Sequence, residues 1–228
     1  EIIIVDNEST DQTLNRAKNF NVKKIVNIKD YLPGKALNEG IKEASGDYVV
    51  CISAHCIPVN NLWLENLVNA IEQEDSIAGA YGRQEPMHFS SQSDKRDLLL
   101  VFGLDPKIQI KDSFFHNANS IVKREILKDF PFDAKTTNIE DRLWGQQMID
   151  NNYKLAYTPE ASVYHHHGIH QDGNEERLKN VVRIIENMTS LSTGGKINPD
   201  DLSTYAIIPM KGLSLTIKSK TLLQLTIE

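Results

Sequence analysis

The feature that most constrains the fold is a regular alternation of short apolar runs with amphipathic segments near the start of the chain. Four apolar runs, rich in β-branched residues, predict strands at residues 1–5, 22–28, 48–53 and 77–82. The segments between them carry apolar side chains at helical spacing and predict helices at residues 12–19, 35–44 and 61–72. Strands and helices that alternate through short connections predict an α/β sandwich around a mostly parallel sheet.

Composition supports a folded domain and excludes several classes of protein. The chain has 228 residues, of which 40% are hydrophobic and 25% charged, so it can bury a sizeable core. A pI near 5.7 argues against nucleic acid as a partner, because no positive excess is present to meet phosphates. There is no run of about 18 apolar residues, so the sequence predicts no membrane span. Two cysteines, Cys51 and Cys56, cannot form a disulfide framework and favour a cytoplasmic setting.

The rest of the chain has a less regular pattern. Residues 85–115 show no clear period and are expected to cross the face of the sheet. After them, the sequence predicts strands at 116–122, 155–157 and 161–165, and helices at 123–128, 139–151 and 175–190.

The domain organisation is expected to have three parts. They are a main domain over residues 1–192, a Gly- and Pro-containing linker over 193–204, and a separate segment over 205–228. Because residues 1–5 already form a strand, we also expect an N-terminal truncation.

Polar residues that follow the predicted strands mark a candidate site. In an open α/β sheet, ligands bind beyond the carboxyl ends of the strands. Asp6 ends the first strand, and Ser53 and His55 follow the third. These residues are therefore candidates before any family is considered.

Three blocks of the sequence resemble the family 2 glycosyltransferases with a GT-A fold. They are VDNESTD at 5–11, GKALNEGIKEASGDYVVCIS at 34–53 and IEDRLWGQQMIDNNYKLAYTPEASVYH at 139–165, in the family's order and spacing. The resemblance covers residues 1–190, although the family's usual first strand is absent. It implies a nucleotide-diphospho-sugar transferase-like, three-layer α/β/α sandwich. It also implies an enzyme that moves a sugar from a nucleotide-sugar to an acceptor hydroxyl, with inversion, in bacterial surface polysaccharide synthesis.

On this resemblance, the donor nucleotide is bound by residues of the first two blocks. Asp6 matches the acidic residue that contacts the base or ribose, although a helix N-cap is the structural alternative. The residues assigned to the donor side are Asp6, Ser9, Gly34, Asn38, Ser53 and His55.

The metal site implied by the family is altered in this sequence. Ser53-Ala54-His55 stands where the family commonly carries Asp-x-Asp, whose carboxylates suit Mg²⁺ or Mn²⁺. His55 could ligate a metal or contact the diphosphate. In the tract His165-His166-His167, adjacent side chains of an extended segment alternate faces, so the three cannot all ligate one ion easily. In some relatives a histidine at this position approaches the metal or the diphosphate, and the resemblance implies His165 as the second metal candidate. His166 and His167 are expected at the surface.

The third block implies the catalytic base. Asp141 matches the carboxylate that deprotonates the acceptor hydroxyl, with Glu140 in support. A favourable charge at a helix N-terminus is the structural alternative for this pair. The residues assigned to the acceptor are Asn117, Asn119 and Trp144, whereas Trp63 is expected in the core.

The C-terminal segment resembles a different family. Residues 208–225 are similar to the start of CMP-sugar synthetases (cytidylyltransferases), with Lys211, Gly212, Ser214 and Lys220 at the phosphate-loop positions. Alternatively, YAIIP at 205–209 replaces the absent first strand of the sheet, within one chain or in a strand-exchanged homodimer.

The expected partners are a nucleotide-sugar donor and a saccharide or lipid-linked saccharide acceptor. A lipid-linked acceptor would place the protein at the inner face of the membrane by peripheral association. The competing function is a catalytically impaired nucleotide-binding fragment of a bifunctional glycosyltransferase and cytidylyltransferase, because Asp-x-Asp and the first strand are absent.

Overall fold

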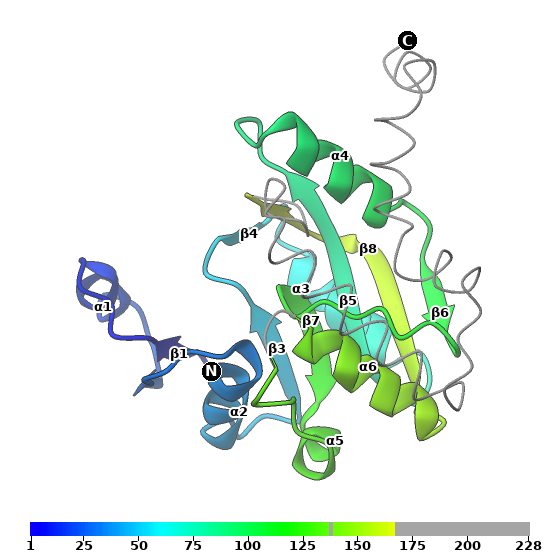
Figure 1. The fold of residues 1–228 in the computed structure, drawn as a ribbon, viewed down its shortest axis with the longest axis horizontal. Coiled ribbons are helices and arrows are strands. Elements are labelled where there is room, and N and C mark those ends of the chain that lie inside the picture. The colour runs from blue at the N-terminus through cyan, green and yellow to red at the C-terminus, as the bar shows by residue number, and fades with distance from the viewer. Residues whose placement is uncertain (137–138, 167–228) are drawn as a thin grey trace. The chain divides into compact units, whose positions relative to one another are not determined.

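A computed structural model describes residues 1–136 and 139–166 of the chain, and the fold is drawn in Figure 1. The chain divides into two compact units. The first comprises residues 1–85 and 102–166, and the second comprises 86–101 and 167–228. The described element of the second unit is helix α4 (Gln92–Val101). The predicted helix at 175–190, the linker and the segment at 205–228 lie outside the described residues.

The first unit begins with a small parallel sheet. Strands β1 (Ile3–Asp6) and β2 (Lys24–Asn27) pair in register, so that Asp6 lies opposite Asn27. The short helix α1 (Thr13–Ala17) connects them, and α2 (Pro33–Lys42) follows with proline in its first turn. A Cβ on Gly40 of α2 would lie 2.9 Å from Val5, so this glycine permits close packing of α2 on β1.

A second, six-stranded sheet forms the main body of the unit. Its strands are β3 (Tyr48–Ile52), β4 (Cys56–Pro58), β5 (Ile77–Pro86), β6 (Lys107–Gln109), β7 (Asn119–Lys123) and β8 (Lys154–His165). Their order is β3-β7-β5-β8-β4, with β6 on β8. β7 runs antiparallel to both β3 and β5, and β8 runs antiparallel to both β4 and β6.

The expectation of a mostly parallel sheet is therefore wrong in its pairing, although the α/β class is correct. β3 and β5 do run in the same direction, as their helical crossover requires. They are not neighbours, because β7 inserts between them from a distant part of the sequence. Local alternation of strand and helix does not reveal such an insertion.

Helices cover the two faces of this sheet (Figure 1). Helix α3 (Trp63–Ile71) packs on one face, where Leu67 and Ile71 join Ile77, Ala80 and Ile121 in a buried cluster. Helix α6 (Glu140–Asp150) lies on the opposite face, and α5 (Arg124–Asp129) directly follows β7. The result is the layered α/β/α arrangement that the resemblance implied.

Several elements differ from the prediction. The two strands expected at 155–157 and 161–165 are one continuous strand, β8. The segment at 85–115 contains α4 and β6, and residues 56–58 form β4; none of these was predicted. In α4 the leucines at 98–100 are consecutive instead of spaced at three and four, which hides the helix from a periodicity argument. Among the residues that the structure describes, no helix is both long and apolar enough to cross a bilayer.

Candidate functional site

The carboxylate of Asp141 lies in the first turn of α6, beside the loop that precedes β7. Its Oδ2 accepts a hydrogen bond from the backbone N–H of Asn117 at 3.3 Å, and its Oδ1 accepts one from Arg142 N–H at 2.8 Å. The predicted base and the predicted acceptor residue Asn117 are thus adjacent. Asn117 is 7% exposed, and its Nδ2 makes no hydrogen bond within the described part of the chain.

The half-buried position of Asp141 lowers the acidity of its carboxyl group. Desolvation raises the pKa of its carboxyl group above the ordinary 3.8, while the Arg142 charge and the two backbone hydrogen bonds oppose that rise in part. A carboxylate with a raised pKa is a stronger base than a solvent-exposed one. The environment of Asp141 therefore suits the acceptance of a proton from a hydroxyl group.

Arg142 is a neighbour of the site that the sequence analysis missed. Its guanidinium lies 4.8 Å from the centre of the Phe114 ring, and its charge interacts with Asp141 and Asp112. Burial lowers the pKa of Arg142, and these carboxylates counteract the fall. The only signal in the sequence was its position beside Asp141.

Helix α2 holds the loop that leads to α6. Asn38 on α2 donates from Nδ2 to the carbonyl of Phe132 at 2.7 Å and accepts from its N–H at 3.1 Å. Both polar groups of the Asn38 amide thus form hydrogen bonds with the backbone of Phe132, so this donor-side candidate stabilises the loop before α6. Gly34, another donor-side candidate, also faces this loop: a Cβ there would lie 1.9 Å from the Asp133 carbonyl oxygen and 3.3 Å from Glu140 Cβ.

We therefore expect Gly34→Ala to destabilise the protein by about 1–3 kcal/mol, the usual cost of overpacking. The Asp133 backbone must move to make room for the methyl group. Equilibrium unfolding in urea measures the change. Gly103→Ala is the matched control, because a Cβ at Gly103 meets nothing within 4 Å. Equal stability of the two variants would contradict this packing.

Asp6 lies at the carboxyl end of β1 and is 4% exposed. Its Oδ2 accepts a hydrogen bond from the backbone N–H of Ser9 at 2.9 Å, which shapes the loop after the strand. At the start of α1, the N–H of the first helical residue, Thr13, donates a hydrogen bond to Oδ1 of a different residue, Asp11, at 2.8 Å. Asp6 is therefore not the cap of this helix.

Two histidines from distant parts of the chain meet at the end of β8. His55 Nε2 and His165 Nε2 are 2.8 Å apart, and the ring centres are 4.7 Å apart. His55 sits on a turn closed by the hydrogen bond from Cys56 N–H to the Ser53 carbonyl at 2.9 Å. His165 is 3% exposed. His166 is exposed, as expected, whereas His167 lies outside the described residues.

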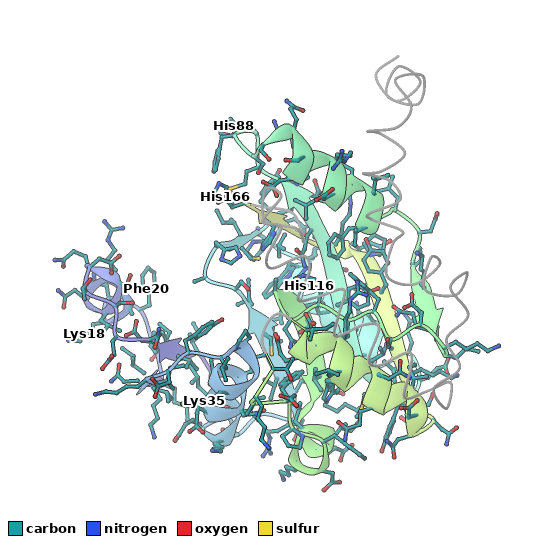
Figure 2. All side chains as sticks on the ribbon, viewed as in Figure 1. Lys18, Phe20, Lys35, His88, His116 and His166 are labelled. Carbon is teal, nitrogen blue, oxygen red and sulfur yellow. The ribbon has the colours of Figure 1, made fainter. Side chains whose placement is uncertain are left out.

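Two further residues, neither of them predicted, lie beside this histidine pair. Cys56 is buried on β4 directly opposite His165, and the potential ligand atoms of His55, Cys56 and His165 all lie within 4.8 Å of one another. The ring of His116, labelled with His166 in Figure 2, is 6.5 Å from that of His165. Burial raises the pKa of the Cys56 thiol to about 12, so in the metal-free protein this cysteine is not a nucleophile.

These residues do not fit the Mn²⁺ or Mg²⁺ site that the family pattern implies. Both ions prefer oxygen ligands, chiefly carboxylates. The group of potential ligands that the structure describes here consists of two imidazoles and a thiol.

Two acceptor assignments are corrected by the structure. Asn119 is 0% exposed; it accepts from Trp63 Nε1 at 2.8 Å and donates to the carbonyls of Ala161 and Arg83 at 2.7 and 3.2 Å. Its amide is committed to the core and cannot reach a sugar. Trp144 is 1% exposed, and its Nε1 donates to the Phe130 carbonyl at 3.0 Å. Both side chains point into the protein, a direction that the sequence did not reveal.

Comparison with known proteins agrees with this fold. The family model of glycosyl transferase family 2 matches residues 1–130. The chain is 27% identical over 179 residues to the O-antigen chain rhamnosyltransferase WbaN of Salmonella anatum, covering 73% of this chain and 56% of that protein. It is 37% identical over 180 residues to a dolichyl N-acetyl-α-D-glucosaminyl phosphate 3-β-D-2,3-diacetamido-2,3-dideoxy-β-D-glucuronosyltransferase of Methanococcus voltae, covering 70% and 54%.

The chain thus spans about half the length of these curated relatives. Among solved structures, it resembles the mannosyltransferase PcManGT from Pyrobaculum calidifontis in complex with GDP-Man and Mn²⁺. The TM-score is 0.61 at 18% identity, and the match covers 91% of this chain and 60% of that one. At this identity the likeness shows the fold alone. Because the family model matches more than half of its residues, the chain belongs to glycosyl transferase family 2.

Proposed function

We propose that the protein transfers a sugar from a nucleotide-sugar to an acceptor hydroxyl, with inversion, in the assembly of a surface polysaccharide. The observation that carries the proposal is Asp141 itself, a half-buried carboxylate of raised pKa beside the backbone N–H of Asn117. The relatives, an O-antigen rhamnosyltransferase and a glucuronosyltransferase, support the same class of reaction.

In this proposal, Asp141 accepts the proton of the acceptor hydroxyl as its oxygen attacks the anomeric carbon of the donor. The bond from that carbon to the diphosphate breaks, and the nucleoside diphosphate leaves with its electron pair. We assign to Asn117 Nδ2, which is buried and has no hydrogen-bond partner in the described chain, a hydrogen bond to the acceptor sugar. A lipid-linked acceptor would bring the protein to the inner face of the membrane.

Asp6 is the residue to which we assign recognition of the nucleoside. It is buried at a strand end, and Ser9 N–H orients its carboxylate. A carboxylate held this way can accept hydrogen bonds from a base N–H or a ribose hydroxyl. Ser53 and His55, which follow β3, are assigned to the diphosphate.

The proposal predicts selective stabilisation by one nucleoside diphosphate among UDP, GDP, dTDP and CDP. At a concentration of 100 times Kd, we expect the melting temperature to rise by about 5–10 °C. Asp6→Asn should abolish the rise. Asp11→Asn is the control, because Asp11 is an exposed carboxylate of the same loop that bonds only locally. An equal rise in the Asp6 variant and the wild type would refute the role of Asp6, and no rise with any of the four would refute donor binding by this chain.

The similarity of the C-terminal segment to cytidylyltransferases remains a prediction. Residues 205–228, with the phosphate loop or the replacement strand expected there, lie outside the described residues. Absence of Asp-x-Asp is the observation behind the competing function, a nucleotide-binding fragment without turnover. Diphosphate binding without sugar transfer would favour that alternative.

A further inference from the structure

The cluster of His55, Cys56 and His165 is built by the fold and not by sequence proximity alone. Cys56 and His165 are directly opposite each other in the antiparallel β4–β8 pair, so their side chains lie on the same face of the sheet. The turn from Ser53 to Cys56 places His55 on the same site. Each of the three ligand-bearing residues is therefore positioned by backbone hydrogen bonding.

The contact between the two imidazoles indicates a place for a cation. Two Nε2 atoms 2.8 Å apart cannot both present lone pairs to each other unless a positive centre lies between or beside them. In the metal-free protein a single proton satisfies this requirement, since one neutral imidazole donates and the other accepts. A metal ion satisfies it equally well when both rings carry their proton on Nδ1.

The distances suit an ion of the zinc class. Nitrogen and sulfur atoms that share a tetrahedral Zn²⁺ lie about 3.3–3.6 Å apart, given Zn–N and Zn–S bonds of about 2.0 and 2.3 Å. The three potential ligand atoms here all lie within 4.8 Å of one another, so small side-chain rotations bring them onto one ion. His55 is exposed, which leaves one side of the cluster open to solvent.

The chemistry of these ligands decides which ion is preferred. Thiolate and imidazole ligands select Zn²⁺ and Co²⁺, whereas Mn²⁺ and Mg²⁺ favour carboxylate and water oxygens. We propose that His55, Cys56 and His165 form a site for a thiophilic divalent ion, of which Zn²⁺ is the expected occupant, in place of the Mn²⁺ site of related folds. The role of the ion in sugar transfer rests on the proposed function. The test described next measures metal binding alone and does not depend on transfer activity.

Cobalt titration of the tag-free protein tests this site through its optical spectrum. We expect Co²⁺ to produce a near-ultraviolet sulfur-to-metal charge-transfer band, and Zn²⁺ but not excess Mn²⁺ to remove it. Cys56→Ser should abolish the band and weaken Zn²⁺ binding at least about tenfold, the lower limit seen for loss of even an outer-shell partner. His55→Gln should weaken binding likewise.

Two variants are the controls. Cys51→Ser removes the other buried cysteine, which lies on β3 opposite Ser120, and should keep the band. His166→Ala removes the exposed neighbour of His165 and should also keep it, which excludes adventitious binding by the histidine tract.

Three results would overturn the inference. They are a wild-type protein without a thiolate band, a band that survives in Cys56→Ser, and Mn²⁺ binding as tight as Zn²⁺ binding. A nucleoside diphosphate that raises the melting temperature of a protein without the cobalt band would leave the proposed function standing and refute the metal site alone. The histidine pair would then be a metal-free hydrogen bond.

Discussion

Asp141→Asn is expected to reduce the kcat/KM of sugar transfer about 10²–10⁴-fold, the usual contribution of a positioned general base. Asparagine keeps one of the two acceptor oxygens, and thus the hydrogen bond from the N–H of either Asn117 or Arg142, but cannot accept the substrate proton. Donor affinity should therefore stay within a few-fold of the wild-type value. The measurements are steady-state kinetics and the diphosphate-induced shift in melting temperature.

The pH profile gives a second readout of the same residue. The base must be deprotonated, so activity rises as pH increases through its pKa. Because burial raises the pKa of Asp141, the acid limb of kcat/KM should lie above the ordinary 3.8 of an aspartate. Asp141→Asn should remove this limb from whatever activity remains.

Asp150→Asn is the matched control for Asp141→Asn. It makes the same change on the same helix, at an exposed carboxylate that accepts from Gln146 Nε2 at 2.8 Å. It should retain wild-type kinetics. Joint loss of donor affinity and turnover in Asp141→Asn would show that the residue organises the site and is not its base.

Trp144→Ala is expected to lower the free energy of unfolding by about 3–5 kcal/mol, as for other large-to-small changes in a core. The indole is 1% exposed, packs against Phe115 and Phe132 with ring centres 4.9 and 5.6 Å away, and bonds the Phe130 carbonyl. Chemical denaturation measures the loss.

Since such a loss can prevent folding, Trp144→Phe is the second variant. It keeps an aromatic ring but loses the indole N–H, so we expect a smaller destabilisation with the transfer reaction retained. Gln147→Ala, an exposed change on the same helix, should alter stability by less than about 0.5 kcal/mol. A stable Trp144→Ala protein with a raised KM for acceptor alone would restore the acceptor role that the sequence suggested.

Helices and strands with a strong local period were predicted well. The pattern of residues 35–44 and 61–72 gave α2 and α3, and apolar runs gave β3 and the first part of β5. The expectation that His166 lies at the surface is also correct. Each of these features depends on the repeat of the backbone itself, which neighbouring residues specify.

Features that depend on pairing between distant segments were missed. The short strand β4 carries no period of its own and exists because β8 pairs with it. That pairing brings Cys56 to His165, a contact that no local pattern of the sequence predicted. Likewise, the sequence predicted that Asn119 binds the acceptor, whereas in the structure its side-chain amide forms hydrogen bonds with Trp63 and with two backbone carbonyls.

The sequence by itself determined the α/β class, the family, and the position of Asp141 at the start of a helix, because each is written in local periodicity or contiguous motifs. The tertiary structure decided which strands are neighbours and which way Asn119 and Trp144 point. It also assembled the group of potential ligands at the end of β8. Strand pairing and burial depend on contacts between residues from separate elements of the chain, such as Cys56 and His165, and no local pattern specifies them.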